Sequence, residues 1–112
     1  MMTQLAVLFI FLMQDTVVVN GTGGMSYRVF VNDRKLCFSA FDSTGSYYET
    51  TLDYGDVYEP AISITPKDLL HIVWRKENSI YYVTTLNGIT PDYIRGGGEP
   101  RWWEKVPVSY AP

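Results

Sequence analysis

A short segment of this chain occurs twice, and this internal repeat limits the folds that the chain can adopt. Residues 47–53 read YYETTLD and residues 81–87 read YYVTTLN, so five of seven positions are identical at an offset of 34. Two upstream pairs of segments correspond at an offset of 33: residues 36–41 with 69–74, and residues 29–32 with 62–65. Repeats of about 20–50 residues are typical of solenoids, propellers and arrays of small units.

The repeated segments have the composition of β-strands. Residues 69–76 are largely apolar on both faces at a period of two, as in a central strand covered on two sides. Residues 80–85 are β-branched and aromatic, and turn-forming sequences separate the segments. Only residues 90–95 predict a helical turn, with Thr90 as N-cap and Pro91 in the first position.

The sequence therefore predicts an all-β fold of two antiparallel meanders. A fourth strand is expected at Val57–Pro60 in the first unit and at residues 101–106 in the second. Four antiparallel strands form one blade of a β-propeller, so we expect about two blades of an incomplete propeller. An unrelated β-sandwich, in which the repeat is two similar hairpins, is the alternative. The expected strands lie near residues 27–32, 35–42, 46–52, 57–64, 69–76, 79–86 and 101–108, with blade-like repeat 1 at residues 26–60 and blade-like repeat 2 at residues 61–110.

The beginning of the chain is apolar and is set apart as residues 1–14. Residues 5–13 are too short to span a bilayer as a helix, but their length fits the apolar core of a secretory signal peptide. However, no Lys or Arg precedes the run and no A-x-A-like cleavage site follows it. A buried strand and an artefact of how the chain is delimited are the alternatives.

Composition removes several functional classes. A hydrophobic fraction of 46% supplies enough apolar surface for a core, and a net charge of −3 argues against nucleic-acid binding. Cys37 and His71 are the only residues of their types, which excludes an internal disulfide and any multi-His or Cys-rich metal site. Both are expected to pack in the core or between blades. Asp53, Asp56 and Glu59 lack the ligand spacing of a calcium loop, so we expect no metal and no cofactor.

Residues 51–58, TLDYGDVY, resemble the Asp-box of sialidase-like β-propellers, S-x-D-x-G-x-x-W. Asp53 and Gly55 match the motif, whereas Thr51 replaces Ser and Tyr58 replaces Trp. In such a turn the Asp side chain accepts hydrogen bonds from backbone amides, and Gly supplies a positive φ. The resemblance implies that Tyr58 begins the fourth strand and packs beneath the turn.

The resemblance covers residues 26–110, although the motif is degenerate in the second unit. Asn87 there replaces Asp, and a long insertion, residues 88–100, precedes Trp102. Three glycines at 96–98 predict that this insertion is a mobile surface loop. Residues 71–74, HIVW, are also similar to the second strand of such blades.

The resemblance implies an extracellular or cell-surface protein. Sialidases of this family use an arginine triad, an Arg in an x-R-x-P motif, a Tyr–Glu pair and an acidic acid/base residue, whereas the Asp-box is structural. No Arg of this chain lies in x-R-x-P. Tyr48 and Glu49 are adjacent on a strand and therefore point to opposite faces, so they cannot form the Tyr–Glu pair. The resemblance therefore assigns no catalytic residue to this chain. We expect a fragment that serves as a non-catalytic binding or scaffold module; the alternative is part of an exo-sialidase-like glycoside hydrolase whose catalytic residues lie outside this chain.

Trp102 and Trp103 are candidates for ligand contact. Their adjacent positions place one indole on each face of a strand, so one is expected in the core. The other could stack on a carbohydrate or pack against a neighbouring blade. Because closed propellers have about four to eight blades, the expected partners are further blades, from a longer chain or by self-association. A carbohydrate or protein ligand is also expected, but no nucleic-acid or membrane partner.

Overall fold

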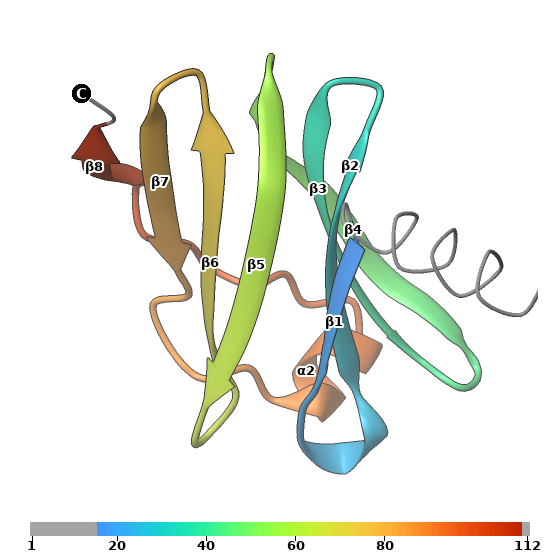
Figure 1. Ribbon diagram of the computed structural model, residues 1–112. Helices are drawn as coiled ribbons and strands as arrows, with labels where there is room; N and C mark the ends of the chain where they lie inside the picture. Colours follow the sequence, from blue (N-terminus) through green and yellow to red (C-terminus); the bar gives the residue numbers. More distant parts are fainter. Residues whose placement is uncertain (1–15, 111–112) are drawn as a thin grey trace, which may run out of the picture.

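The computed structural model describes residues 16–110 and shows two antiparallel sheets of four strands each (Figure 1). The all-β class predicted from the sequence is therefore confirmed, whereas the predicted segment of residues 1–14 lies outside the described residues. The first sheet contains β1 (Thr16–Asn20), β2 (Ser26–Asn32), β3 (Lys35–Asp42) and β4 (Gly45–Tyr54), in this order. The second contains β5 (Val57–Thr65), β6 (Leu69–Lys76), β7 (Ser79–Thr84) and β8 (Val106–Tyr110), also in order.

The described helical segments are short. A 3-10 turn, η2 (Thr22–Gly24), connects β1 to β2, and one helical turn, α2 (Pro91–Arg95), lies between β7 and β8. The helical turn predicted at residues 90–95 is thus confirmed, with Thr90 in the N-cap position. Within the described residues, no helix has the length and apolar character needed to cross a membrane.

The repeat in the sequence is also a repeat in strand register. In the β3–β4 hairpin, Phe38 lies opposite Thr50, and in the β6–β7 hairpin the equivalent residues, His71 and Thr84, lie opposite each other. The pairs two residues further along each hairpin correspond in the same way: Ala40 lies opposite Tyr48 in the first, and Val73 lies opposite Tyr82 in the second. The two hairpins are therefore equivalent units of structure as well as of sequence.

The fourth strand of each unit differs from the prediction. Val57–Pro60 is not the outer strand of the first sheet, because these residues begin β5 and β5 pairs with β6. The first sheet instead gains β1, a β-branched segment that pairs with β2. The repeated strands consequently occupy places two to four in the first sheet and one to three in the second.

The last strand of the second sheet is interrupted. Trp102 forms a bridge with Thr85, and β8 pairs with β7 from Val106 onward. The strand predicted at residues 101–106 is therefore wrong in its extent, because Glu104 and Lys105 lie outside both paired segments.

One hydrophobic core lies between the sheets. Each sheet contributes one face to it, and β5 is the strand of the second sheet that lies closest to β1, β2 and β3. The long connection from β7 to β8 passes toward the first sheet, where α2 lies (Figure 1). Each fully buried large apolar side chain stabilises the fold by about 1.5–3 kcal/mol. The largest buried side chains include Tyr27 and Phe38 from the first sheet, Ile72 and Trp74 from the second, and Ile94 from the connection.

Candidate functional site

Asp53, at the end of β4, connects three parts of the fold. It is 4% exposed, and its Oδ2 accepts a hydrogen bond of 2.9 Å from Nε1 of Trp74 in β6. Its Oδ1 accepts hydrogen bonds from the amide of Tyr54 at 2.9 Å, from Nζ of Lys76 at 3.2 Å and from Nζ of Lys105 at 2.7 Å. The carboxylate therefore joins β4, β6 and the segment that precedes β8.

The same contacts set the ionisation of Asp53. Burial alone would raise its pKa, but the hydrogen bonds from Lys105, Trp74 and the neighbouring amide outweigh that cost and lower the pKa below its ordinary value. Asp53 is consequently a carboxylate at neutral pH with both oxygens engaged. Such a group holds structure together and is not free to act as a nucleophile or a general acid.

The turn that follows Asp53 has the expected glycine geometry. Gly55 has φ of +103°, a conformation that side-chain-bearing residues rarely adopt. The amide of Gly55 donates a 2.9 Å hydrogen bond to the carbonyl of Arg34, so of the two turn amides, those of Tyr54 and Gly55, it is the Tyr54 amide that donates to Asp53. The turn is therefore fixed partly by the neighbouring β2–β3 hairpin loop.

Tyr58 does not pack beneath the turn, so that expectation is wrong. It lies opposite Arg75 in the β5–β6 pair, on the face of the second sheet away from the core. Its hydroxyl donates to the carbonyl of Glu77 at 2.8 Å, and the Arg75 guanidinium lies 5.3 Å from its ring centre. The indole that contacts Asp53 comes instead from Trp74, because the chain enters the second sheet immediately after the turn.

Trp102 and Trp103 line one cavity of about 190 Å³. Trp102 is half-buried and makes an edge-to-face contact with Phe38, with ring centres 5.0 Å apart. Trp103 is 60% exposed, while its backbone amide donates to the carbonyl of Thr84 at 2.9 Å. One indole therefore packs against the core and the other faces solvent. The remaining lining residues are Thr50, Thr51, Leu52, Trp74, Val83 and Lys105.

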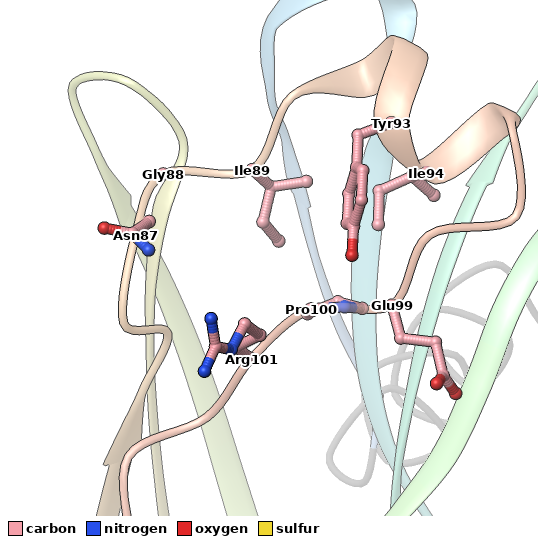
Figure 2. Close-up of a pocket in the computed structure, with 8 residues that line it drawn as sticks. All are labelled: Asn87, Gly88, Ile89, Tyr93, Ile94, Glu99, Pro100 and Arg101. Atoms are coloured by element: carbon pink, nitrogen blue, oxygen red, sulfur yellow. The ribbon is translucent and has the colours of Figure 1, made fainter.

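A second cavity, of about 160 Å³, lies in the long connection between β7 and β8 (Figure 2). Ile94 is fully buried and Arg95 bonds Asp42, so the connection is anchored to the first sheet. This site was not found from the sequence, because a glycine-rich insertion predicts a mobile loop. The apolar residues within the insertion could have indicated that it packs against the rest of the fold. The cavity is lined by Asn87, Gly88, Ile89, Tyr93, Ile94, Glu99, Pro100 and Arg101.

The chain's single histidine and single cysteine have structural neighbours. His71 is half-exposed, and its Nδ1 lies 2.7 Å from the Tyr82 hydroxyl while its Nε2 lies 3.1 Å from Oγ1 of Thr65. Its ring also stacks on Tyr82. Cys37 is a buried free thiol. Residues 16–110 contain no group of three His, Cys, Asp or Glu side chains that could hold a metal ion.

The arginines have separate surroundings and form no common cluster. Four of them have described partners: Arg28 over the Phe30 ring, Arg34 with Asp56, Arg75 with Glu59, and Arg95 with Asp42. Arg101 lines the second cavity. Tyr48 packs against the core whereas the adjacent Glu49 is exposed. The pieces of a sialidase centre are therefore not brought together in residues 16–110.

Comparisons with known proteins yield no family, since the chain has no significant match to a protein-family model, a curated protein or a solved structure.

Proposed function

We propose that this chain is a non-catalytic binding module built from two blades of a sialidase-like β-propeller, within an extracellular or cell-surface protein. The ligand in this proposal is a carbohydrate that stacks on Trp103. The observation that carries it is the cavity of about 190 Å³ beside that exposed indole.

Strand order supports the propeller arrangement. Each sheet is a four-stranded antiparallel meander, the unit from which propeller blades are made. The first strands, β1 and β5, lie against each other, while β8 forms the far edge of the second sheet (Figure 1). The shared register of the two hairpins supports a common origin for the two units.

The composition of the Trp103 cavity suits a sugar. The apolar face of a pyranose ring stacks on an indole, while its hydroxyls need nearby donors and acceptors. Two hydroxyl-bearing residues, Thr50 and Thr51, are among those that line the cavity. Lys105 supplies an ammonium group with three protons, of which one is donated to Asp53. A cavity of this size accommodates a single sugar residue rather than a drug-sized ligand.

The outer face of the second sheet suits a further blade, either from a longer chain or from another copy. Val73, Ile80 and Tyr82 are only half-buried there, and Val106 is 45% exposed. In a propeller, the next blade covers such a face. Covering this face would remove apolar surface from water, which stabilises the assembly by about 25 cal/mol for each Å² buried.

Tryptophan fluorescence with a panel of neutral, amino and acidic monosaccharides tests the carbohydrate proposal. A ligand that stacks on Trp103 changes the emission saturably, and Trp103→Ala removes the response. Tyr54→Ala is the matched control, because Tyr54 is also an exposed aromatic residue, at 62%, but does not line the cavity. If no sugar of the panel binds, or if Trp103→Ala binds as the unmodified chain does, the proposal fails.

A further inference from the structure

The second cavity combines an apolar enclosure with one cationic side chain. Ile89, Tyr93 and Pro100 surround its centre in Figure 2, and the Arg101 guanidinium lies on the same side as Asn87. Ile89 and Pro100 are buried residues, whereas Arg101 is exposed. A ligand placed here meets apolar walls and, at one end, a group of guanidinium donors.

Several contacts fix the walls of this cavity. The amide of Ile89 donates to the carbonyl of Asp68 at 2.9 Å, and the amide of Leu86 donates to the carbonyl of Arg101 at 2.8 Å. Gly88 packs so closely on the carbonyl of Lys67 that a Cβ would collide with it. The Ile89 bond and the Gly88 contact hold the first framing segment against the loop between β5 and β6, and the Leu86 bond joins that segment to Arg101 in the second. Little ordering is therefore needed when a ligand binds.

The aromatic wall is held in a comparable way. The ring of Tyr93 lies directly against Gly98, where a Cβ atom would overlap the ring. The amide of Gly98 donates to the carbonyl of Tyr93 at 2.8 Å, and the adjacent Ile94 is fully buried. The glycine thus provides room for the ring, which forms a preformed flat surface.

Arg101 has no acidic partner among the described residues. The salt bridges of residues 16–110 engage Arg34, Arg75 and Arg95 but not Arg101. Glu99 lines the same cavity, but Figure 2 shows its carboxylate directed away from the enclosed space. A guanidinium binds a carboxylate with two parallel hydrogen bonds, which is the interaction this position leaves available.

We propose that the cavity formed by Ile89, Tyr93, Pro100 and Arg101 binds a small organic carboxylate. The apolar body of the ligand lies between Ile89 and the Tyr93 ring, and its carboxylate pairs with Arg101. This site shares no lining residue with the Trp103 cavity, so it is independent of the proposed carbohydrate function.

Titration of the full chain by ¹H–¹⁵N NMR with phenylacetate and with phenylacetamide tests the proposal, because the two probes have the same shape and differ in charge. Phenylacetate should shift the signals of Asn87, Gly88 and Ile89 and the side-chain signal of Arg101. A hydrogen bond between two charged groups contributes more to binding than one to a neutral group. The affinity for phenylacetamide should therefore be lower than that for phenylacetate by a factor of about ten or more.

Arg101→Gln should reduce phenylacetate binding to the level of phenylacetamide. Arg34→Gln is the matched control, since Arg34 is an exposed arginine outside the cavity, and it should leave binding unchanged. Trp103→Ala should also leave phenylacetate binding unchanged, which separates this proposal from the carbohydrate one. Absence of phenylacetate binding, equal affinity for both probes, or unchanged discrimination in Arg101→Gln would overturn the proposal. If Arg101→Gln does not fold, the two-probe comparison on the unmodified chain decides alone.

Discussion

Nε1 of Trp74 donates a hydrogen bond of 2.9 Å to Oδ2 of Asp53, and this bond joins the last strand of the first sheet to an internal strand of the second. The bond is buried, and Lys76 reaches the same carboxylate from the same strand. Asp53 is thus both the last buried residue before the turn and an anchor for the second sheet. Its removal should affect the packing between the sheets as well as the turn.

Asp53→Ala should lower the free energy of unfolding by about 2–4 kcal/mol. The substitution leaves the buried indole N–H of Trp74 and the ammonium group of Lys76 without their acceptor, which costs more than the net value of the bonds. Urea unfolding followed by circular dichroism measures the change.

Asp56→Ala is the control for this prediction. Asp56 pairs with Arg34 at 2.7 Å, but the side chain of Asp56 is 71% exposed and that of Arg34 is 70% exposed. An exposed pair of this kind contributes about 0–1 kcal/mol. Equal losses in Asp53→Ala and Asp56→Ala would show that Asp53 is not a structural anchor.

The stability of the chain should fall in acid, partly because of Asp53. Its folded-state pKa is lowered, so the unfolded chain takes up a proton at a higher pH than the folded chain does. This contribution is therefore present above the unfolded value of about 3.9 and is lost as pH falls through the folded pKa.

Unfolding free energies measured by urea titration from neutral pH downward test the acid dependence. The unmodified chain should lose stability below about pH 4, and Asp53→Asn, which does not titrate, should show a shallower fall. Asp56→Asn should retain the steeper dependence. Parallel curves for the unmodified chain and Asp53→Asn would contradict the assignment.

Much of the fold could be predicted because the repeat and the alternation of side chains are local properties of the sequence. The strands around Phe38 and Ile72, the helical turn after Thr90 and the left-handed glycine at 55 all follow from such patterns. The partner of β5 could not be predicted in this way, because pairing depends on where the chain goes after Gly55. Val57–Pro60 suits an outer strand of one sheet and the first strand of the next equally well.

The candidate sites were only partly accessible to sequence reasoning for a related reason. Trp102 and Trp103 stood out by composition, and Asp53 by its turn. The contact between Asp53 and Trp74 joins residues 21 positions apart on different sheets, and no local pattern indicates it. The Arg101 cavity depends on long-range contacts of the insertion, such as that between Ile89 and Asp68.

Trp102→Ala should mainly lower stability, whereas Trp103→Ala should mainly remove sugar binding. Trp102 is half-buried against Phe38, so its truncation should cost about 2–4 kcal/mol of unfolding free energy. Trp103 is largely exposed, so its truncation should change stability by about 0.5 kcal/mol or less while it removes sugar binding. Thermal unfolding together with the fluorescence titration measures both. A large loss of stability in Trp103→Ala would indicate a packing role instead.

Val73→Lys should reduce self-association if the outer face of the second sheet takes another blade. Val73 lies opposite Tyr82 on that face and is half-buried. A buried lysine would have to lose its hydration when a second copy docks, which weakens the contact. Light scattering after size-exclusion chromatography should show the unmodified chain as larger than a monomer and Val73→Lys as a smaller species. Ser43→Lys, in the exposed β3–β4 turn, is the control and should associate as the unmodified chain does.

The purified chain should leave a fluorogenic sialoside uncleaved at any protein concentration tested. A retaining glycosidase needs a nucleophile and an acid/base residue about 5 Å apart on one face, and a sialidase also needs arginines around the substrate carboxylate. Here Glu49 is exposed while Tyr48 packs against the core, and Arg34, Arg75 and Arg95 pair with three different carboxylates. An active sialidase assayed in parallel shows that the substrate is competent. Turnover that disappears in Arg28→Ala, Arg75→Ala or Glu49→Gln would contradict the prediction, because it would require a catalytic site assembled between copies of the chain.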